Sequence, residues 1–155
     1  MSALQTVALH LSRHHQTVTC AESCTGGLLA AALTEISGSS QWFQQSFVTY
    51  SNQAKSERLG VSPATLLAHG AVSQETVREM AQGAKTLAGA DYALSISGIA
   101  GPTGGSPEKP VGTVWFGLAT PQTCLQCTVL FEGNRQQIRQ KAVDYALNLL
   151  AEHLV

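Results

Sequence analysis

The sequence predicts a three-layer α/β/α sandwich built on a mixed, mostly parallel β-sheet. Predicted helices alternate with single strands early in the chain, a strongly apolar strand at 92–97 opens into a glycine-rich loop, and two further strands adjoin near the end. Alternation of strands and helices favours parallel pairing, whereas adjoining strands add an antiparallel hairpin. At 155 residues the chain has the length of one domain, spanning 1–155.

Helices and single strands alternate through the first half of the chain. Leu4, Val7 and Leu11 recur at helical intervals, and the β-rich run 17–20 follows them. Ser73 is a residue type that caps a helix, and a longer helix is predicted after it. The predicted helices of this half cover 3–14, 28–36, 52–59, 63–69 and 74–88, and its predicted strands cover 17–20 and 47–50.

The second half opens on a buried strand, Tyr92–Ser97, and closes on an amphipathic helix. Between them, the segment 98–110 is too rich in glycine and proline for regular structure, and two strands at 111–119 and 123–131 are predicted to form a hairpin. Ligands of such folds bind at the carboxyl ends of strands. We therefore expect the site where the segment around Ser23 and the glycine-rich loop leave their strands.

Composition and charge exclude several classes of protein. Hydrophobic residues make up 44% of the chain and charged residues 12%, which is too apolar for disorder. The net charge of −1 provides no field for DNA or RNA, so no nucleic-acid partner is expected. No apolar run reaches the ~18 residues of a membrane span, and residues 1–15 lack the features of a signal peptide. We expect a cytoplasmic protein with no membrane partner.

The four cysteines are expected to be free thiols, because a reducing compartment disfavours disulfides. Cys124 and Cys127 have the spacing of a metal or redox pair, yet residues three apart on a strand face opposite sides of the sheet. Cys20 and Cys24 do not complete the usual paired spacing of a four-cysteine zinc site. We therefore predict no metal site and no redox chemistry.

Ser23 is the candidate nucleophile, at a strand-to-helix turn where the first helical amides lack intrahelical partners. Such amides stabilise an oxyanion. Gly26 and Gly27 carry no side chain, so a substrate could approach the amides of Thr25 and Gly26 closely. The alternative is that Ser23 only caps the helix, which is the commoner use of serine in this place.

Lys55 is the candidate base for this serine. A serine nucleophile relies on a base, and all five histidines lie in terminal helices or before a turn glycine. Lys55 lies on a helix directly after a strand, and burial there would lower its pKa until it can accept a proton. The alternative is a solvated surface lysine. Tyr50 and Asn52 offer hydrogen-bond donors at the same strand end, unless they only close the turn.

The loop at 98–105 provides candidates for binding a nucleotide. Its backbone amides, with that of Gly104 among them, could surround a ribose or a phosphate, and Ser97 and Thr103 could add hydroxyls. The loop is not a Walker A motif, because no Gly-Lys-Ser or Gly-Lys-Thr follows it.

Arg135 and Arg139 are the candidates for holding a phosphate. They are four residues apart in the first turns of the last helix, where basic side chains oppose the helix dipole. A bound phosphate would explain both placements. Pairing with Glu132 or exposure to solvent is the alternative.

Five segments taken together resemble the CinA C-terminal domain family, whose stand-alone members are nicotinamide-nucleotide amidases. The segments recur in order across nearly the whole chain, so chance similarity is improbable. They are AESCTGG at 21–27, WF at 42–43 with FVTYSNQAK at 47–55, HGAVS at 69–73, SISGIAGP at 95–102 with GG at 104–105, and KPVGTVWF at 109–116.

The resemblance implies an amidohydrolase that converts nicotinamide mononucleotide to nicotinate mononucleotide and ammonia in recycling of the pyridine nucleotide pool, without a cofactor. By position, Ser23 would be the nucleophile and Lys55 its base, with Tyr50, Asn52 and Thr103 lining the site. Longer relatives carry an N-terminal domain resembling a molybdopterin-binding fold, which we do not expect here. A non-catalytic nucleotide-binding module and a regulatory module tied to competence or DNA damage are the alternatives. The sequence is compatible with a homo-oligomer but does not determine the oligomeric state.

Overall fold

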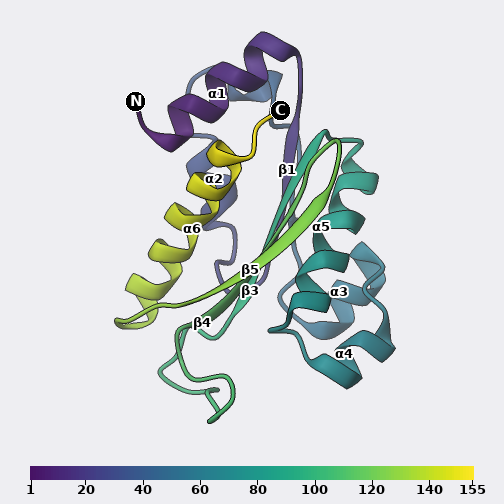
Figure 1. Ribbon diagram of the computed structural model, residues 1–155, viewed down its shortest axis with the longest axis vertical. Helices are drawn as coiled ribbons and strands as arrows, with labels where there is room; N and C mark the ends of the chain where they lie inside the picture. Colours follow the sequence, from purple (N-terminus) through teal and green to yellow (C-terminus); the bar gives the residue numbers. More distant parts are fainter.

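The computed structural model describes all 155 residues and contains five strands and six α-helices (Figure 1). The strands are β1 (Val18–Glu22), β2 (Phe47–Val48), β3 (Tyr92–Gly98), β4 (Thr113–Ala119) and β5 (Cys124–Leu130). The helices are α1 (Ala3–His14), α2 (Leu28–Leu33), α3 (Asn52–Leu59), α4 (Pro63–His69), α5 (Gln74–Ala88) and α6 (Arg135–Glu152), with a 3₁₀ turn at Ser39–Gln41.

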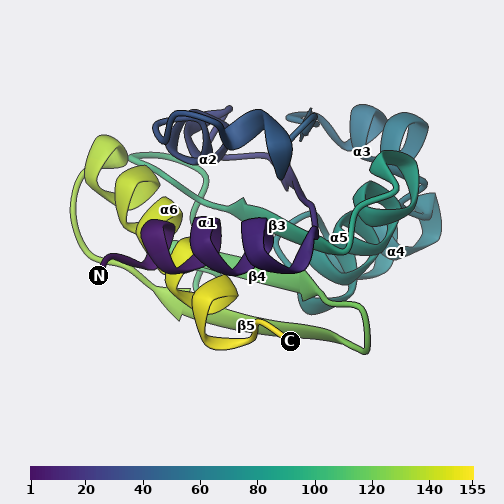
Figure 2. The same cartoon turned by 90° about the horizontal axis from the view of Figure 1, so that it is seen from above.

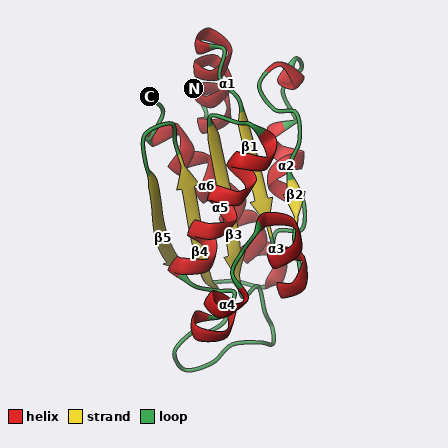
Figure 3. Ribbon diagram, turned by 90° about the vertical axis from the view of Figure 1, so that its right-hand side faces the viewer, coloured by secondary structure: helices red, strands yellow, loops and turns green.

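The strands form one sheet in the order β2-β1-β3-β4-β5 (Figure 3). β1 pairs in parallel with β2 and with β3, whereas β4 is antiparallel to both β3 and β5. Every strand except β4 therefore runs in the same direction. The predicted mixed sheet and the predicted β4–β5 hairpin are both confirmed.

Helices cover both faces of the sheet, which confirms the predicted α/β/α sandwich. α1, α2 and α6 lie on one face, and α3, α4 and α5 lie on the other (Figure 1). Seen from above, α1 and α6 lie side by side over the first face (Figure 2). On the second face α5 packs along the strands, and α3 and α4 pack against α5.

The core is divided by the sheet into a large apolar cluster beneath α6 and a smaller one beneath α5. Along β3 the side chains alternate, so that Ile96 joins the large cluster while Ala93 joins the small one. Ser95 also faces α5, and its hydroxyl donates to the carbonyl of Val77 at 2.6 Å. A Cβ at Gly117 would lie only 2.5 Å from the same carbonyl oxygen, so glycine there allows α5 to approach the sheet closely.

Some element ends differ from those predicted. β1 continues to Glu22, so the turn that carries Ser23 begins directly at the strand end. α2 stops at Leu33, three residues earlier than expected, and the Thr34 hydroxyl donates to a carbonyl of its last turn. None of the helices is both long enough and apolar enough to span a membrane.

Candidate active site

A cavity of about 280 Å³ opens where the carboxyl ends of β1 and β3 meet the first turns of α3 and the start of α6. The glycine-rich loop after β3, at the foot of the molecule in Figure 1, forms part of its wall. Two of its lining side chains are cationic and none is acidic, so the cavity favours an anionic ligand. Its lining residues are Ser23, Cys24, Tyr50, Asn52, Lys55, Ala71, Val72, Ser97, Gly98, Ile99, Ala100, Gly101, Thr103, Gly104 and Arg135.

The structure brings Ser23 and Lys55 together in this cavity. The Lys55 Nζ lies 3.0 Å from the Ser23 Oγ, which is hydrogen-bond distance. Ser23 is the first residue after β1, and its amide donates to the carbonyl of Ile96 at 3.0 Å, which ties the turn to β3. Lys55 reaches the serine from the first turns of α3, across 32 residues of sequence.

Lys55 is buried, so its interpretation as a solvated surface lysine is wrong. The side chain is 1% exposed, and burial lowers the pKa of Lys55 from its ordinary 10.5 to about 8. Its amine also contacts the carbonyls of Thr49 at 3.1 Å and Tyr50 at 3.2 Å. A neutral amine donating to these two carbonyls would direct its lone pair toward Ser23. The geometry therefore suits proton transfer from the serine hydroxyl.

The buried carboxylate of Glu22 caps α2, and the sequence reasoning missed it. It accepts the Thr25 hydroxyl at 2.5 Å, the Leu29 amide at 2.8 Å and the Ala30 amide at 3.0 Å. Ser23 makes no capping bond to α2, so its interpretation as a helix cap is wrong. Because Glu22 occupies the amides of Leu29 and Ala30, these two helical amides are not available to a substrate oxyanion.

The turn after Ser23 leaves two other amides free. The Gly26 amide already donates to the Ser23 carbonyl at 3.1 Å, so its predicted role as an oxyanion donor is wrong. The amides of Cys24 and Thr25 make no hydrogen bond within the protein. Cys24 lines the cavity, whereas the Thr25 side chain is buried behind the turn. These two amides are the donors that the turn can offer to a ligand.

Tyr50 contributes to the site through two different groups. Its carbonyl accepts hydrogen bonds from Lys55 and, at 3.3 Å, from the Ser23 hydroxyl. Its phenol is mostly exposed and accepts a hydrogen bond from Arg135 at 3.1 Å. The phenol is therefore part of the outer wall of the cavity, while the main chain of Tyr50 holds the Ser23–Lys55 pair.

Asn52 and Thr103 line the cavity with side chains that make no hydrogen bond within the protein. The cap of α3 is Ser51, whose hydroxyl accepts the Ala54 amide at 3.0 Å, so Asn52 is not needed to close that turn. Gly104 lies beside Thr103 in the cavity wall with φ of +94°, a conformation that favours glycine. These polar groups are free to meet a ligand.

Arg135 lines the cavity at the start of α6. Its guanidinium donates to the carbonyl of Gly101 at 2.8 Å and to the phenol of Tyr50. These contacts hold the cation at the edge of the cavity, between the glycine-rich loop and the connection from β2 to α3. Its proposed pairing with Glu132 is not observed.

Arg139 does not line the cavity, so the prediction that it holds a phosphate together with Arg135 is wrong. Its guanidinium donates to the carbonyls of Cys24 at 3.0 Å and Thr25 at 3.3 Å. One turn of α6 separates the two arginines along the helix axis, and that offset directs Arg139 to the back of the Ser23 turn. Arg139 therefore braces the turn and lies outside the ligand space.

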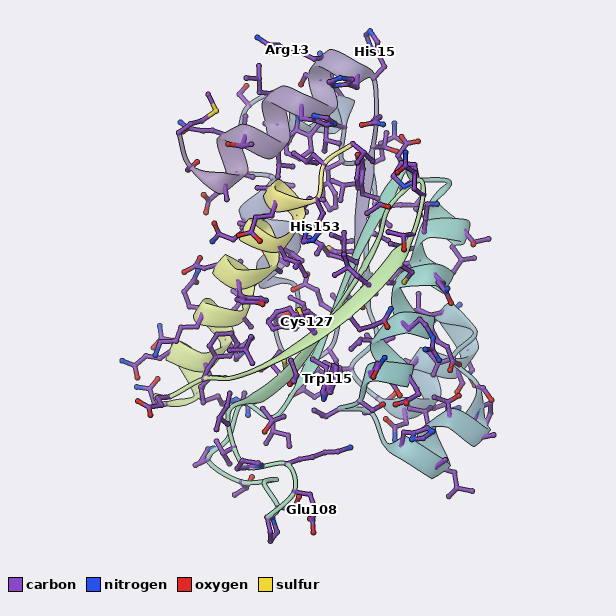
Figure 4. The ribbon with its side chains drawn as sticks, in the orientation of Figure 1. Arg13, His15, Glu108, Trp115, Cys127 and His153 are labelled. Atoms are coloured by element: carbon purple, nitrogen blue, oxygen red, sulfur yellow. The ribbon has the colours of Figure 1, made fainter.

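The cavity contains no histidine. The glycine-rich loop that walls the cavity carries Glu108, and His15 lies at the opposite end of the molecule from this residue, far from the cavity (Figure 4). His69 lies outside the cavity lining and pairs with Glu75 at 3.7 Å. Lys55 is consequently the basic side chain within reach of Ser23.

The cysteines offer neither a metal centre nor an activated thiol. Cys124 and Cys127 face opposite sides of β5, as predicted, since Cys124 packs on the α5 side and Cys127 lies 3.6 Å from the Tyr145 hydroxyl of α6. Cys24 lines the cavity, but burial raises its pKa to about 11, so it remains a thiol at neutral pH. No group of three or more metal-ligating side chains converges anywhere in the chain.

Comparison with known proteins identifies the family. The sequence model of the CinA C-terminal domain family matches residues 2–154 of this chain. The chain belongs to the CinA C-terminal domain family. It is 53% identical over 154 residues to nicotinamide-nucleotide amidohydrolase PncC of Escherichia coli K12, covering 97% of this chain and 92% of that protein. It is 59% identical over 131 residues to the protein of the same name from Enterobacter agglomerans, covering 84% of this chain and 80% of that protein.

Solved structures and longer relatives agree with this assignment. The chain superposes on competence damage-inducible protein A from Klebsiella pneumoniae with a TM-score of 0.95 and 41% identity, covering 98% of this chain and 94% of that one. It is also 49% identical to a putative competence-damage inducible protein of Caldanaerobacter subterraneus, covering 93% of this chain but 35% of that protein. This chain therefore corresponds to about a third of the longer relative.

Ala71 and Val72 line the cavity without a predicted role. They lie between α4 and α5, in the HGAVS segment of the family motif, and supply an apolar wall. Apolar residues in a short connection give no chemical signal, so only the motif could have pointed to them.

Proposed function

We propose that this chain deamidates nicotinamide mononucleotide to nicotinate mononucleotide and ammonia, with Ser23 as nucleophile and Lys55 as general base. The observation that supports it most directly is the 3.0 Å contact between Ser23 Oγ and a buried lysine amine in a cavity without acidic side chains. The 53% identity to a nicotinamide-nucleotide amidohydrolase supports the same reaction. We propose a cytoplasmic location as well, where the pyridine nucleotide pool is recycled.

The reaction begins with proton transfer. Neutral Lys55 takes the hydroxyl proton as the Ser23 oxygen attacks the carboxamide carbon, and the pyridinium charge makes that carbon more electrophilic. The amides of Cys24 and Thr25 donate to the oxyanion of the tetrahedral intermediate. The Lys55 ammonium then gives its proton to the amide nitrogen, the C–N bond breaks, and ammonia leaves. Water, deprotonated by Lys55, hydrolyses the resulting ester and restores both residues.

The rest of the cavity suits a mononucleotide. In this proposal Arg135, which lines the cavity, pairs with the phosphate, because a charge-assisted hydrogen bond is strong. We propose that Asn52, Thr103 and the amide of Gly104, which line the cavity, bind the ribose hydroxyls. Val72 would offer an apolar surface for the pyridine ring. A ligand with a phosphate at one end and a carboxamide at the other would span from Arg135 to Ser23.

Purified protein should release one ammonia for each nicotinamide mononucleotide consumed, and a chelator should leave the rate unchanged. Ser23→Ala should lower the rate by several orders of magnitude, as loss of a covalent nucleophile commonly does. Binding of the nucleotide without ammonia release would instead identify a nucleotide-binding module. A folded Ser23→Ala variant with near-normal turnover would disprove the mechanism while leaving the reaction intact.

A further inference from the structure

Ser97 is a buried serine whose hydroxyl has no use within the protein. The residue is 1% exposed and lines the cavity, and its side chain makes no hydrogen bond to any other residue. Of the fully buried side-chain oxygens only Thr49 Oγ1 lacks a hydrogen-bond partner, so the unpaired Ser97 hydroxyl keeps contact with the open space of the cavity, where a ligand can reach it. An unpaired hydroxyl on a cavity wall is explained most directly by a hydrogen bond to the ligand.

Strand register places Ser97 beside the nucleophile. Glu22 of β1 is paired with Ile96 of β3, and the Ser23 amide continues this parallel ladder, so Ser97 is the next residue opposite Ser23. Ser97 has the same orientation as Ser95, whose hydroxyl bonds to α5. Ser23 likewise follows Ala21, which packs on the α5 side. Both serine side chains therefore point to the face of the sheet from which α3 delivers Lys55.

This arrangement divides the polar groups around the reacting carbon into two sets. The free amides of Cys24 and Thr25 follow Ser23 in the turn and can only donate, so they match the carboxamide oxygen. Lys55 must deliver its proton to the carboxamide nitrogen, so that nitrogen has to face the amine. Ser97 lies on the same face as this amine, and its oxygen can accept a hydrogen bond.

We propose that the Ser97 hydroxyl accepts a hydrogen bond from the NH₂ group of the substrate carboxamide and so orients the leaving nitrogen toward Lys55. The inference rests on the proposed function and adds a residue that recognises the amide itself. A carboxamide can enter in two orientations that exchange oxygen and nitrogen. Because the turn amides reject an NH₂ group and Ser97 accepts one, the productive orientation is favoured.

Two ligands that differ in this one group provide the test. 3-Acetylpyridine mononucleotide has the shape of the substrate but carries a methyl group where the carboxamide has NH₂, so it cannot donate to Ser97. Affinities for both mononucleotides would be measured by calorimetry in the Ser23→Ala background, with and without Ser97→Ala. Ser95→Ala is the matched control, because Ser95 is a buried serine of the same strand and face whose hydroxyl is already bonded to Val77.

Ser97→Ala should weaken binding of nicotinamide mononucleotide by about 3- to 10-fold, the usual effect of one neutral hydrogen bond, and should leave the acetylpyridine analogue within twofold. With Ser23 intact, kcat/KM for the substrate should fall at least as far. Ser95→Ala should lower the Tm while both affinities stay within twofold.

Equal weakening of both ligands by Ser97→Ala, or no weakening of either, would overturn the inference. Ammonia release by the wild-type protein decides the proposed function separately. Wild-type activity together with an unchanged affinity ratio would remove only the role of Ser97, whereas a wild type that releases no ammonia would remove the function and the role together.

Discussion

The buried amine of Lys55 leads to a quantitative expectation for the pH dependence of catalysis. With a pKa of about 8, about a tenth of the Lys55 side chains are neutral at pH 7, compared with about 0.03% for a lysine that titrates at 10.5. Only the neutral amine accepts the serine proton, so kcat/KM should rise about tenfold between pH 7 and pH 9 and then level off. The substrate phosphate titrates near pH 6 and is already about nine-tenths doubly ionised at pH 7, so its titration adds little to this rise.

The assay is ammonia release at substrate concentrations well below KM, in buffers of constant ionic strength from pH 7 to 9.5. Lys55→Arg serves as the control, because a guanidinium stays charged throughout and cannot accept the proton. This variant should be nearly inactive at every pH and should show no rise. A wild-type profile that is flat from pH 7 to 9, or that climbs only toward 10.5, would refute the assignment of Lys55 as the base.

The pH dependence of the free energy of unfolding provides an independent measurement of the Lys55 titration. Between pH 8 and 10.5 the unfolded chain holds a proton on Lys55 that the folded chain has released, so the free energy of unfolding rises with pH through this window. The full change corresponds to about 3 kcal/mol. Lys55→Met lacks this titration, so the stability of wild type relative to the variant should increase by about that amount, as measured by urea unfolding at pH 7.5 and 10.5. If the stability difference between wild type and Lys55→Met does not change with pH, the conclusion that burial lowers the pKa of Lys55 is contradicted.

Three further substitutions separate ligand binding from catalysis. Arg135→Ala should raise KM for nicotinamide mononucleotide by about 10- to 150-fold and hardly affect nicotinamide riboside, which lacks the phosphate, in steady-state kinetics with both substrates. Arg139→Ala should lower kcat by about 10- to 100-fold with little change in KM, because it removes the hydrogen bonds that brace the turn carrying Ser23. A variant with an altered KM and a normal kcat would contradict this prediction. Cys24→Ala should retain kcat within about threefold in the ammonia assay, because a thiol with a pKa of about 11 is not the nucleophile, and complete inactivation of a folded variant would show otherwise.

The sequence predicted the fold because its signals are local. Apolar spacing marks the helices, and the Gly-rich segment after Tyr92–Ser97 marks the loop that walls the cavity. Residue types typical of turns likewise marked the strand-to-helix turn at Ser23 and the strand end before Lys55. These features identified where the polar side chains would gather.

The sequence could not supply the direction of individual side chains. Arg135 and Arg139 look equivalent as a pair four residues apart, yet one lines the cavity and the other braces the turn. Glu22 is adjacent to Ser23, but its role as the cap of α2 depends on how the strand enters the helix. The position of Ser97 depends on which strands are neighbours in the sheet, which no local pattern reveals.

The amine of Lys55 contacts main-chain oxygens as well as the Ser23 hydroxyl, and this limits how mutation can affect its position. The carbonyls of residues 49 and 50 are present whichever amino acids occupy those positions. Side-chain substitution there can alter the surroundings of the base but cannot delete the groups that orient it. Amino-acid substitutions at these two positions should therefore be tolerated, provided that the backbone path from β2 into α3 is unchanged. An inserted or deleted residue in that short connection should inactivate the enzyme more reliably than a substitution at either carbonyl position.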